Sequence, residues 1–306
     1  MFFGDKRTNA AFLSIVSNGI LVILKLIVGF MTGAVSIISE AAHSGLDLAA
    51  SVVAFFAVRQ AARPPDNKHA YGHGKFENIS GSVEAILIIV AAVLILREAG
   101  EKLFYPSPIE GLGMGMLVML VSATANFFIA RYLTKVGLET DSMALQADAL
   151  HLRTDVYTSL GVLAGLGLIK LTGLPILDPL VAIGVALFIF KAGFDLVKRS
   201  VAELSDIRLP EEEEAMIRSI LEANIPLVVE YHGLRTRKSG SERHIDVHLV
   251  VSKYMPVGEA HRICDDVEQA IDAQLNNAYI VIHLEPCTEA SGACQHLECQ
   301  RRGDLP

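Results

Sequence analysis

Cysteine is scarce in this chain: the 306 residues include four, all of them near the carboxyl-terminal end. Four thiols are too few for a disulfide-stapled scaffold, so we expect them to be reduced. Three of them and a histidine form a compact C-x6-C-x-H-x2-C cluster. That spacing suits a Cys3His zinc site, and it is equally compatible with a polar tail whose thiols are idle. The cluster comprises Cys287, Cys294, His296 and Cys299, and the remaining thiol is Cys264.

An excess of positive charge is also missing. The formal net charge is −8, and all of it arises after residue 205, because residues 206–306 hold 18 acids against 10 Lys and Arg. Such an acidic region argues against nucleic acid as a partner and is compatible with binding cations. The sequence also lacks a Gly-x4-Gly-Lys-Ser/Thr phosphate loop, since Gly72-His-Gly-Lys75 has a different spacing. We therefore expect no nucleotide cofactor, no ATP-driven pumping and no enzyme activity.

Apolar residues, in contrast, are abundant. They make up 52% of the chain, and the mean hydropathy is +0.43, which is too high for an ordinary soluble protein. Most of them fall into six segments that reach the length of about 20 residues needed to span a bilayer. The six segments are roughly 12–32, 34–58, 79–103, 111–133, 142–171 and 176–198. Residues 1–205 are thus predicted to form an all-α transmembrane domain of six helices.

The orientation of these segments follows from Lys and Arg in the short loops. Cytoplasmic loops carry the excess of these residues. One side of the predicted topology holds nearly all of them, and the opposite side has little beyond Lys102 and Lys170. Both termini are therefore predicted to be cytoplasmic, in a multi-pass membrane protein. The basic side comprises Lys6, Arg7, Arg59, Arg63, Lys68, Lys75, Arg131, Lys135, Lys198 and Arg199.

After residue 205 the periodicity changes to that of a small mixed domain. A helix is expected from about Leu209, where a proline and four glutamates stand in the first turn. Alternating runs at 228–237 and 244–251 flank a Lys-Ser-Gly-Ser turn and predict a hairpin. A helix over 257–275 and a strand over 279–284 complete the order αββαβ, which predicts a ferredoxin-like α+β domain over 206–287. Residues 288–306 form a separate tail that holds most of the Cys/His cluster.

Two stretches far apart in the chain repeat one pattern of ionisable residues within apolar runs. Glu40-Ala-Ala-His43-Ser-Gly-Leu-Asp47 and Asp148-Ala-Leu-His151-Leu-Arg-Thr-Asp155 both read acid-x-x-His-x-x-x-Asp. In a helix these positions share one face, so each stretch directs its side chains the same way. Ionisable groups within a membrane are costly and normally mark an ion pathway. Two imidazoles and two carboxylates make a tetrahedral set suited to Zn2+, and the predicted transport site is therefore His43, Asp47, His151 and Asp155.

Other roles for these intramembrane groups stay open. They could hold helices together by hydrogen bonds, although Ser or Asn would do so more cheaply than an Asp, which costs roughly 2.5–3.5 kcal/mol at a helix centre. Glu40 and Asp148 lie one turn before the histidines. Each could line a vestibule or orient a ligand histidine.

A polar loop and the acidic domain offer further ligand-type residues. The loop after the second segment contains Asp66, His69 and His73, which are adequate for a three-ligand site, although loop histidines are usually just solvated. In the acidic domain, ligand-type side chains are scattered over the predicted strands and the second helix, and from the residues alone they define no site. They are His232, His248, His261, His283 and Glu285, whereas His244 does not obviously join them.

Taken together, these motifs resemble the cation diffusion facilitators, and most nearly the bacterial YiiP-type branch of zinc and iron efflux transporters. The resemblance covers residues from about 8 to 287 and includes the loop His69-Ala-Tyr-Gly-His73-Gly-Lys75. It implies a homodimeric metal/proton antiporter of the bacterial inner membrane, with a transport site, a loop site and a binuclear cytoplasmic site. The implied ligands are His43, Asp47, His151 and Asp155; then Asp66, His69 and His73; then His232, His248, His261, His283 and Glu285.

Two residues depart from the YiiP-type pattern. His43 stands where that branch has an aspartate, and Glu285 stands where it tends to have a shorter acid. Imidazole is softer than carboxylate, so the departure at His43 favours Zn2+ over Mn2+ or Mg2+. The expected function is export of Zn2+ in exchange for protons, with Zn2+ also a structural or regulatory ligand and the lipid bilayer as surroundings. Co2+, Cd2+ and Fe2+ remain as further cargoes. The rival functions are an Fe2+-preferring exporter, a passive metal channel and a transport-inactive metal sensor or scaffold.

Overall fold

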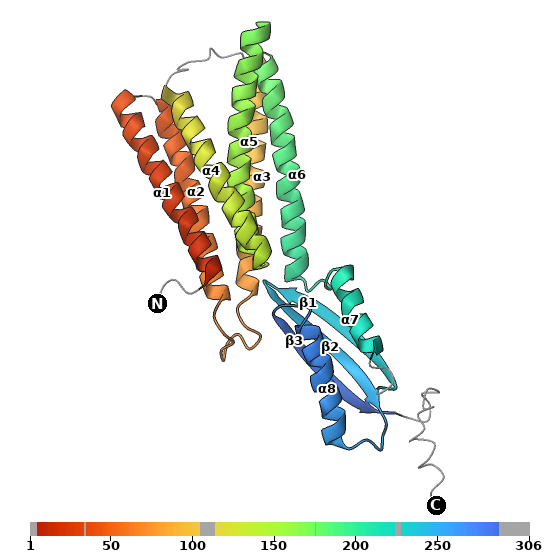
Figure 1. The fold of residues 1–306 in the computed structure, drawn as a ribbon. Helices are drawn as coiled ribbons and strands as arrows, with labels where there is room; N and C mark the ends of the chain where they lie inside the picture. Colours follow the sequence, from red (N-terminus) through yellow and green to blue (C-terminus); the bar gives the residue numbers. More distant parts are fainter. Residues whose placement is uncertain (1–4, 34, 105–113, 175, 224–227, 288–306) are drawn as a thin grey trace, which may run out of the picture. The chain divides into compact units, whose positions relative to one another are not determined.

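A computed structural model describes residues 5–33, 35–104, 114–174, 176–223 and 228–287 of the chain. The chain divides into two compact units, and the division falls between Leu204 and Ser205. The first unit is a bundle of long helices, and the second is a small domain with a three-stranded sheet (Figure 1). Each unit has hydrophobic core clusters of its own.

Six long helices form the first unit, in agreement with the six apolar segments of the sequence. At about 1.5 Å per residue each is long enough to cross a hydrocarbon layer of about 30 Å. Five of them, all but α5, are long and apolar enough among the described residues to be membrane spans. The helices are α1 (Lys6–Thr32), α2 (Val35–Ala61), α3 (Lys75–Phe104), α4 (Met114–Glu139), α5 (Met143–Thr172) and α6 (Leu177–Leu204).

The first helix starts earlier than its apolar run. The run begins near residue 12, whereas α1 begins at Lys6, because the carboxylate of Asp5 caps the helix by accepting a hydrogen bond from the Arg7 backbone N–H at 3.2 Å. At the other end Gly33 adopts a left-handed conformation with φ of 67°, which stops the helix and permits the tight turn into α2.

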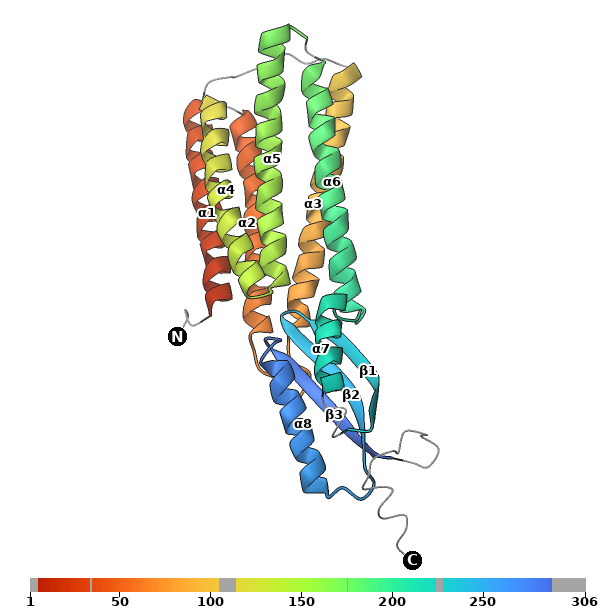
Figure 2. The ribbon, with the colours of Figure 1, turned by 45° about the vertical axis from the view of Figure 1, so that its right-hand side comes forward.

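Successive helices run in opposite directions, so the bundle has two distinct ends (Figure 2). We call the end where α1 begins and α6 finishes the near end, and the opposite one the far end. The buried core clusters of this unit lie in its near half, where α3 packs on α6 and α4 on α5. The near end carries Lys6, Ala61, Lys75, Glu139, Met143 and Leu204, and the far end carries Thr32, Val35, Phe104, Met114, Thr172 and Leu177.

A glycine allows three helices to approach closely at the near end. A Cβ atom added to Gly81 of α3 would lie 3.0 Å from Cγ of Met143 and 3.2 Å from Oγ of Ser200. Small residues at such positions are the usual means by which membrane helices pack tightly. The near half of the bundle is therefore closely packed where α3, α5 and α6 meet.

The second unit has the predicted order αββαβ. Strand β2 pairs with β1 as an antiparallel hairpin and with β3 in parallel, and α8 makes the crossover between β2 and β3. Both helices lie on one face of the sheet, and Ile217, Ile245 and Val267 belong to the core between them (Figure 2). The elements are α7 (Glu211–Ala223), β1 (Glu230–Ser239), β2 (Glu242–Val251), α8 (Val257–Asp272) and β3 (Ala278–Pro286).

Candidate metal sites

The two repeated motifs lie on facing helices of the bundle. The first is on α2 and the second on α5, and these two helices are in contact. The structure brings ligand atoms of His43, Asp47 and Asp155 within 4.8 Å of one another. A carboxylate from each helix and an imidazole thus converge on one point, which is a geometry in which they can hold a divalent metal ion.

His151 joins this group through a hydrogen bond. Its Nε2 lies 3.1 Å from Oδ1 of Asp47, and both side chains are buried. The other ring nitrogen, Nδ1, has no hydrogen-bond partner among the described residues. All four side chains predicted for the transport site are therefore adjacent. Asp47 belongs to the group with His43 and Asp155 and also contacts His151.

The neighbours of the site include polar residues that sequence reasoning assigned no part in it. Nδ2 of Asn126 on α4 donates to Oδ2 of Asp155 at 3.3 Å and so orients that carboxylate. Nζ of Lys25 on α1 donates to Glu40 at 3.2 Å and to the Ser44 hydroxyl at 2.8 Å. A lysine within an apolar run was the signal available for Lys25, but which group it would meet depends on how the helices are rotated.

A cavity of about 410 Å3 is lined by His43, Asp47 and Asp155 and extends from them in one direction. It begins near the level of Asp47 and Asp155 and reaches Lys102 near the end of α3 and Asp178 at the start of α6, which belong to the far end. Glu40 lines this passage, so of its two predicted roles the vestibule position is the one its location fits. The cavity therefore connects three of the ligands with the far half of the bundle.

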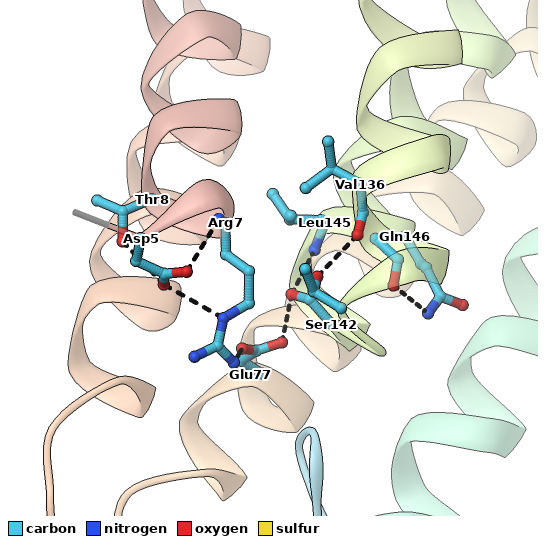
Figure 3. A network of polar contacts seen from close by, with 10 residues as sticks. Asp5, Arg7, Thr8, Glu77, Val136, Ser142, Leu145 and Gln146 are labelled. Carbon is cyan, nitrogen blue, oxygen red and sulfur yellow. Dashed lines mark hydrogen bonds and ion pairs between the residues drawn. The ribbon is translucent and has the colours of Figure 1, made fainter. Parts of the chain in front are cut away.

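The near end is closed by a network of charged and polar groups, which Figure 3 shows from close by. Glu77 on α3 is fully buried and accepts hydrogen bonds from Nη1 of Arg7 at 3.3 Å and from the Ser142 hydroxyl. This carboxylate therefore ties α1 to α3 and to the turn before α5. Beside it, Nδ2 of Asn78 donates to Glu203 of α6 at 2.6 Å.

The loop between α2 and α3 holds the second predicted site. Asp66 accepts backbone hydrogen bonds from His69 at 2.7 Å and from Lys68 at 2.8 Å. These bonds lower the pKa of Asp66, with the His69 N–H the largest cause. The two histidine rings lie 4.4 Å apart, and ligand atoms of Asp66, His69 and His73 all lie within 4.8 Å of one another. Because His73 is buried against Phe76, one of the ligands is held in place before any metal binds.

The third group lies on the sheet face that the two helices leave open. His232, His248 and His283 are direct neighbours across β1, β2 and β3, with ring centroids 5.1 and 5.0 Å apart. Nδ1 of His248 lies 2.9 Å from Oε1 of Glu285, while Nε2 of His232 lies 3.5 Å from Oε2 of the same carboxylate. Glu285 thus contacts ligand nitrogens on either side, as a carboxylate that bridges two metal ions would.

His261 is the one predicted member of this group that lies elsewhere. It stands on α8, exposed, with Nε2 3.8 Å from Oδ1 of Asp265 on the same helix. His244 also stays apart, stacked on Tyr279, as the sequence suggested. Of the proposed Cys/His cluster, only Cys287 falls within the described residues, where it is buried; Cys294, His296 and Cys299 lie outside them.

Comparison with known families agrees with this arrangement. Residues 11–205 match the family model for the cation efflux transmembrane domain, and residues 209–287 match the model for the cation efflux protein, cytoplasmic domain. The chain belongs to the cation efflux family. The resemblance inferred from the motifs is thereby confirmed, as is a helical transmembrane domain followed by a small cytoplasmic domain.

Individual relatives cover most of the chain. The uncharacterized transporter sll1263 of Synechocystis sp. is 36% identical over 86% of this chain and 85% of its own length. The cation-efflux pump FieF of Escherichia coli is 31% identical over 94% of this chain and 95% of its own length. A solved structure of CzrB in its Zn form is 39% identical, covering 28% of this chain and 96% of that one, with a TM-score of 0.26.

Membership of the cation efflux family sets the class of activity. The protein is a multi-pass membrane transporter of divalent cations and not an enzyme. Its second unit belongs to a domain type that dimerises. The choice of metal, the driving force and the roles of individual residues are finer questions, for which the geometry of the three sites is the basis.

Proposed function

We propose that this protein exports Zn2+ from the cytoplasm in exchange for protons by alternating access. The observation that carries the proposal is the meeting of His43, Asp47, His151 and Asp155 beside a cavity that extends toward the far end of the bundle. A transport site that is open to one side and closed on the other is what alternating access requires.

The contacts at the near end support this conformational assignment. In the described bundle the route from the metal site to the near end is filled by packed helices, and the Arg7–Glu77–Ser142 network lies at its mouth. We assign the near end to the cytoplasm, because it carries the Lys and Arg of the short loops and the link to the domain whose family model is cytoplasmic. The structure then corresponds to the state that releases metal outward.

Zinc is the proposed cargo because of the ligand types. Two imidazole nitrogens and two carboxylate oxygens suit a tetrahedral Zn2+ ion, whereas Mg2+ and Mn2+ prefer six oxygen ligands. The contribution of His43 is decisive, since an aspartate there would give a harder, more acidic set.

Protons are the proposed counter-ion because they compete for the same atoms. A metal ion binds neutral imidazole and ionised carboxylate, so binding releases protons and acidification releases metal. The contact between Nε2 of His151 and Oδ1 of Asp47 at 3.1 Å supports this, because it joins two of these atoms across helices within hydrogen-bond distance. Protons entering through the far-end cavity would displace Zn2+ from the site and, carried inward, would drive the next cycle.

A homodimer is proposed as the working unit. His232, His248, His283 and Glu285 form a cluster on an open sheet face, and His261 lies away from it on α8. A second copy of the chain could supply the fifth ligand, so that Zn2+ at this face would strengthen the dimer in a structural or regulatory role.

Two rival functions differ in their requirement for the membrane site. A sensor or scaffold would have no need for the four converging ligands or the cavity that leads to them. A passive channel would need a route open at both ends, whereas the near half of the described bundle is closely packed. An Fe2+-preferring exporter shares the whole architecture and differs only in selectivity.

The site assignment can be tested with zinc flux into proteoliposomes. Asp47→Asn and Asp155→Asn each keep the side-chain shape and remove a charge that the metal requires, so each is expected to lower the initial rate at least tenfold. Asp195→Asn is the matched control, because Asp195 lies on α6 outside the cavity and is exposed. Wild-type rates in both site variants, with the control unchanged, would refute the assignment.

A further inference from the structure

Glu84 is a fully buried acid that the proposed transport site does not use. It lies on α3 between the near-end network around Glu77 and the first cavity-lining residue of that helix, Ala91. Its exposed fraction is 0%, and neither carboxylate oxygen has a hydrogen-bond partner among the described residues. Such a group is rare in a folded protein, because an unpaired buried carboxylate is strongly destabilising.

A second buried acid, Asp148 on α5, acts on it. Asp148 is also 0% exposed; its Oδ1 accepts a hydrogen bond from the Ser51 hydroxyl at 3.2 Å, while its Oδ2 has no partner among the described residues. Its charge would repel an ionised Glu84 across the contact between α3 and α5. Nζ of Lys25, the buried lysine, is engaged by Glu40 and Ser44 instead.

Glu84 lacks the compensation that a negative charge would need. An ionised Glu84 would have no hydrogen bond among the described residues to offset its desolvation, and repulsion from Asp148 would add to that cost. A neutral carboxylic acid fills the same space with a far smaller desolvation penalty. The closely packed near half of the bundle is thus compatible with a protonated Glu84 and incompatible with an ionised one.

We propose that Glu84 is a proton-binding residue that links closure of the near end to protonation. While the near end is closed, a carboxylate oxygen of Glu84 holds a proton; when the near end opens, water enters, the proton passes to that water, and the carboxylate stays ionised until the next closure. Because the proton is bound only in the closed state, a lower pH on the near side shifts the population toward closure. The role of Glu84 in closure rests on the proposed exchange cycle, whereas the protonation of Glu84 does not depend on transport.

Infrared difference spectroscopy of the full-length protein in lipid nanodiscs tests the protonated acid directly. At a pH roughly three units above the ordinary glutamate pKa of about 4.3, the wild type is expected to show a carboxylic-acid C=O band that Glu84→Gln lacks. Glu101→Gln, a change on the same helix at an exposed residue paired with Arg97, should retain the band. The same band in wild type and Glu84→Gln would overturn the proposal. A loss of one bound Zn2+ per chain in Glu84→Gln, with no change of the band, would also overturn it, because Glu84 would then be a metal ligand.

Zinc flux then tests the link to closure. With the far-side pH fixed, the wild-type rate is expected to depend on near-side pH by up to about tenfold per unit for one linked proton, and Glu84→Gln should lose that component. Glu84→Asp, which can still titrate, should keep it. An unaltered pH profile in Glu84→Gln would overturn the linkage. If the wild type itself carried no zinc, the proposed function would fail while the infrared band still decided whether Glu84 holds a proton.

Discussion

Nε2 of His151 on α5 lies 3.1 Å from Oδ1 of Asp47 on α2, and this contact joins the two repeated motifs of the chain. Both side chains are buried, and Asp47 lines the inner end of the cavity. A metal ion and a shared proton are alternative partners for this pair of atoms, since a ligand must be deprotonated to bind metal. Competition for one pair of atoms gives a simple physical basis for exchange of metal against protons.

His43 should determine which metal the site prefers. His43→Asp replaces the softer imidazole by a carboxylate and is expected to lower the preference for Zn2+ over Mn2+ by at least about tenfold, or about 1.4 kcal/mol. Competition between the two ions in a zinc-flux assay measures the ratio. An unchanged ratio in an active variant would show that selectivity arises elsewhere.

The loop site should lose metal through its histidines and not through its aspartate. Backbone hydrogen bonds from His69 and Lys68 lower the pKa of Asp66, so this carboxylate stays ionised as the pH falls through the range in which histidines in general titrate, near about 6.5. Because the pKa of Asp66 is lower in the folded state than in the unfolded state, the ionised carboxylate contributes to stability at pH values above its unfolded-state pKa. That contribution is lost as the pH falls through the folded-state pKa. Zn2+ titrations at stepwise lower pH should show one loss of affinity in the histidine range.

Asp66→Asn provides the comparison for that experiment. It should weaken binding at the loop at neutral pH while leaving the midpoint of the acid-induced loss unchanged. A midpoint in the range of ordinary carboxyl groups, in either protein, would contradict the assignment of the pH dependence to the histidines.

Zinc should strengthen the dimer through His261 as well as through the sheet face. His248→Ala removes the centre of the cluster between His232 and His283 and should abolish the zinc effect on dimerisation. His261→Ala should weaken it while leaving metal bound to the sheet face. Sedimentation of the full-length protein at several protein concentrations, with and without Zn2+, measures both effects.

His244→Ala is the matched control for this pair, since His244 stacks on Tyr279 away from the cluster. A response to Zn2+ in His261→Ala that equals the response of the wild type and of this control would rule out a ligand supplied by the second copy.

Breaking the near-end network should open that end of the bundle. Arg7→Met leaves Glu77 buried without its cation, and removal of one partner from a buried pair typically costs about 3–5 kcal/mol. We expect a cysteine placed at Ser80, buried just inside the network, to react with a water-soluble thiol reagent several-fold faster in the Arg7→Met background. The reporter requires that the native cysteines be replaced.

Lys6→Met is the control for that change. Lys6 pairs with Glu139 at the same end of the bundle, but both side chains are exposed, and such pairs contribute little. If Lys6→Met accelerated the reaction as much as Arg7→Met, the opening would reflect a general loosening of the end and not the loss of the Glu77 network.

Local patterns in the sequence were sufficient to predict the elements and most of the side chains that the structure brings together as candidate ligands. Apolar runs predicted the six helices, and the spacing of His43 to Asp47 and of His151 to Asp155 predicted two facing sets of side chains, because helical periodicity fixes which residues share a face. Alternation predicted the strands that align His232 with His248. The αββαβ order then placed both helices on one face of the sheet and left these histidines on the other.

Contacts between helices could not be predicted in this way. The pairing of Lys25 with Glu40, the hydrogen bond from Asn126 to Asp155 and the burial of Glu84 depend on how each helix is rotated and how closely its neighbours approach. No spacing within a single helix encodes these quantities. The direction of the cavity likewise follows from packing in the near half of the bundle, which is a property of all six helices together.

The coupling of metal to protons is the central claim, and flux under an imposed pH gradient tests it most directly. Wild-type proteoliposomes would hold equal Zn2+ concentrations inside and outside, with one side made acidic. Net Zn2+ movement toward the acidic side is expected, with protons moving the other way. An ionophore that collapses the pH gradient should stop this movement. Zinc that moves only down its own concentration gradient, with no response to pH and no proton movement, would identify a passive channel and contradict the account.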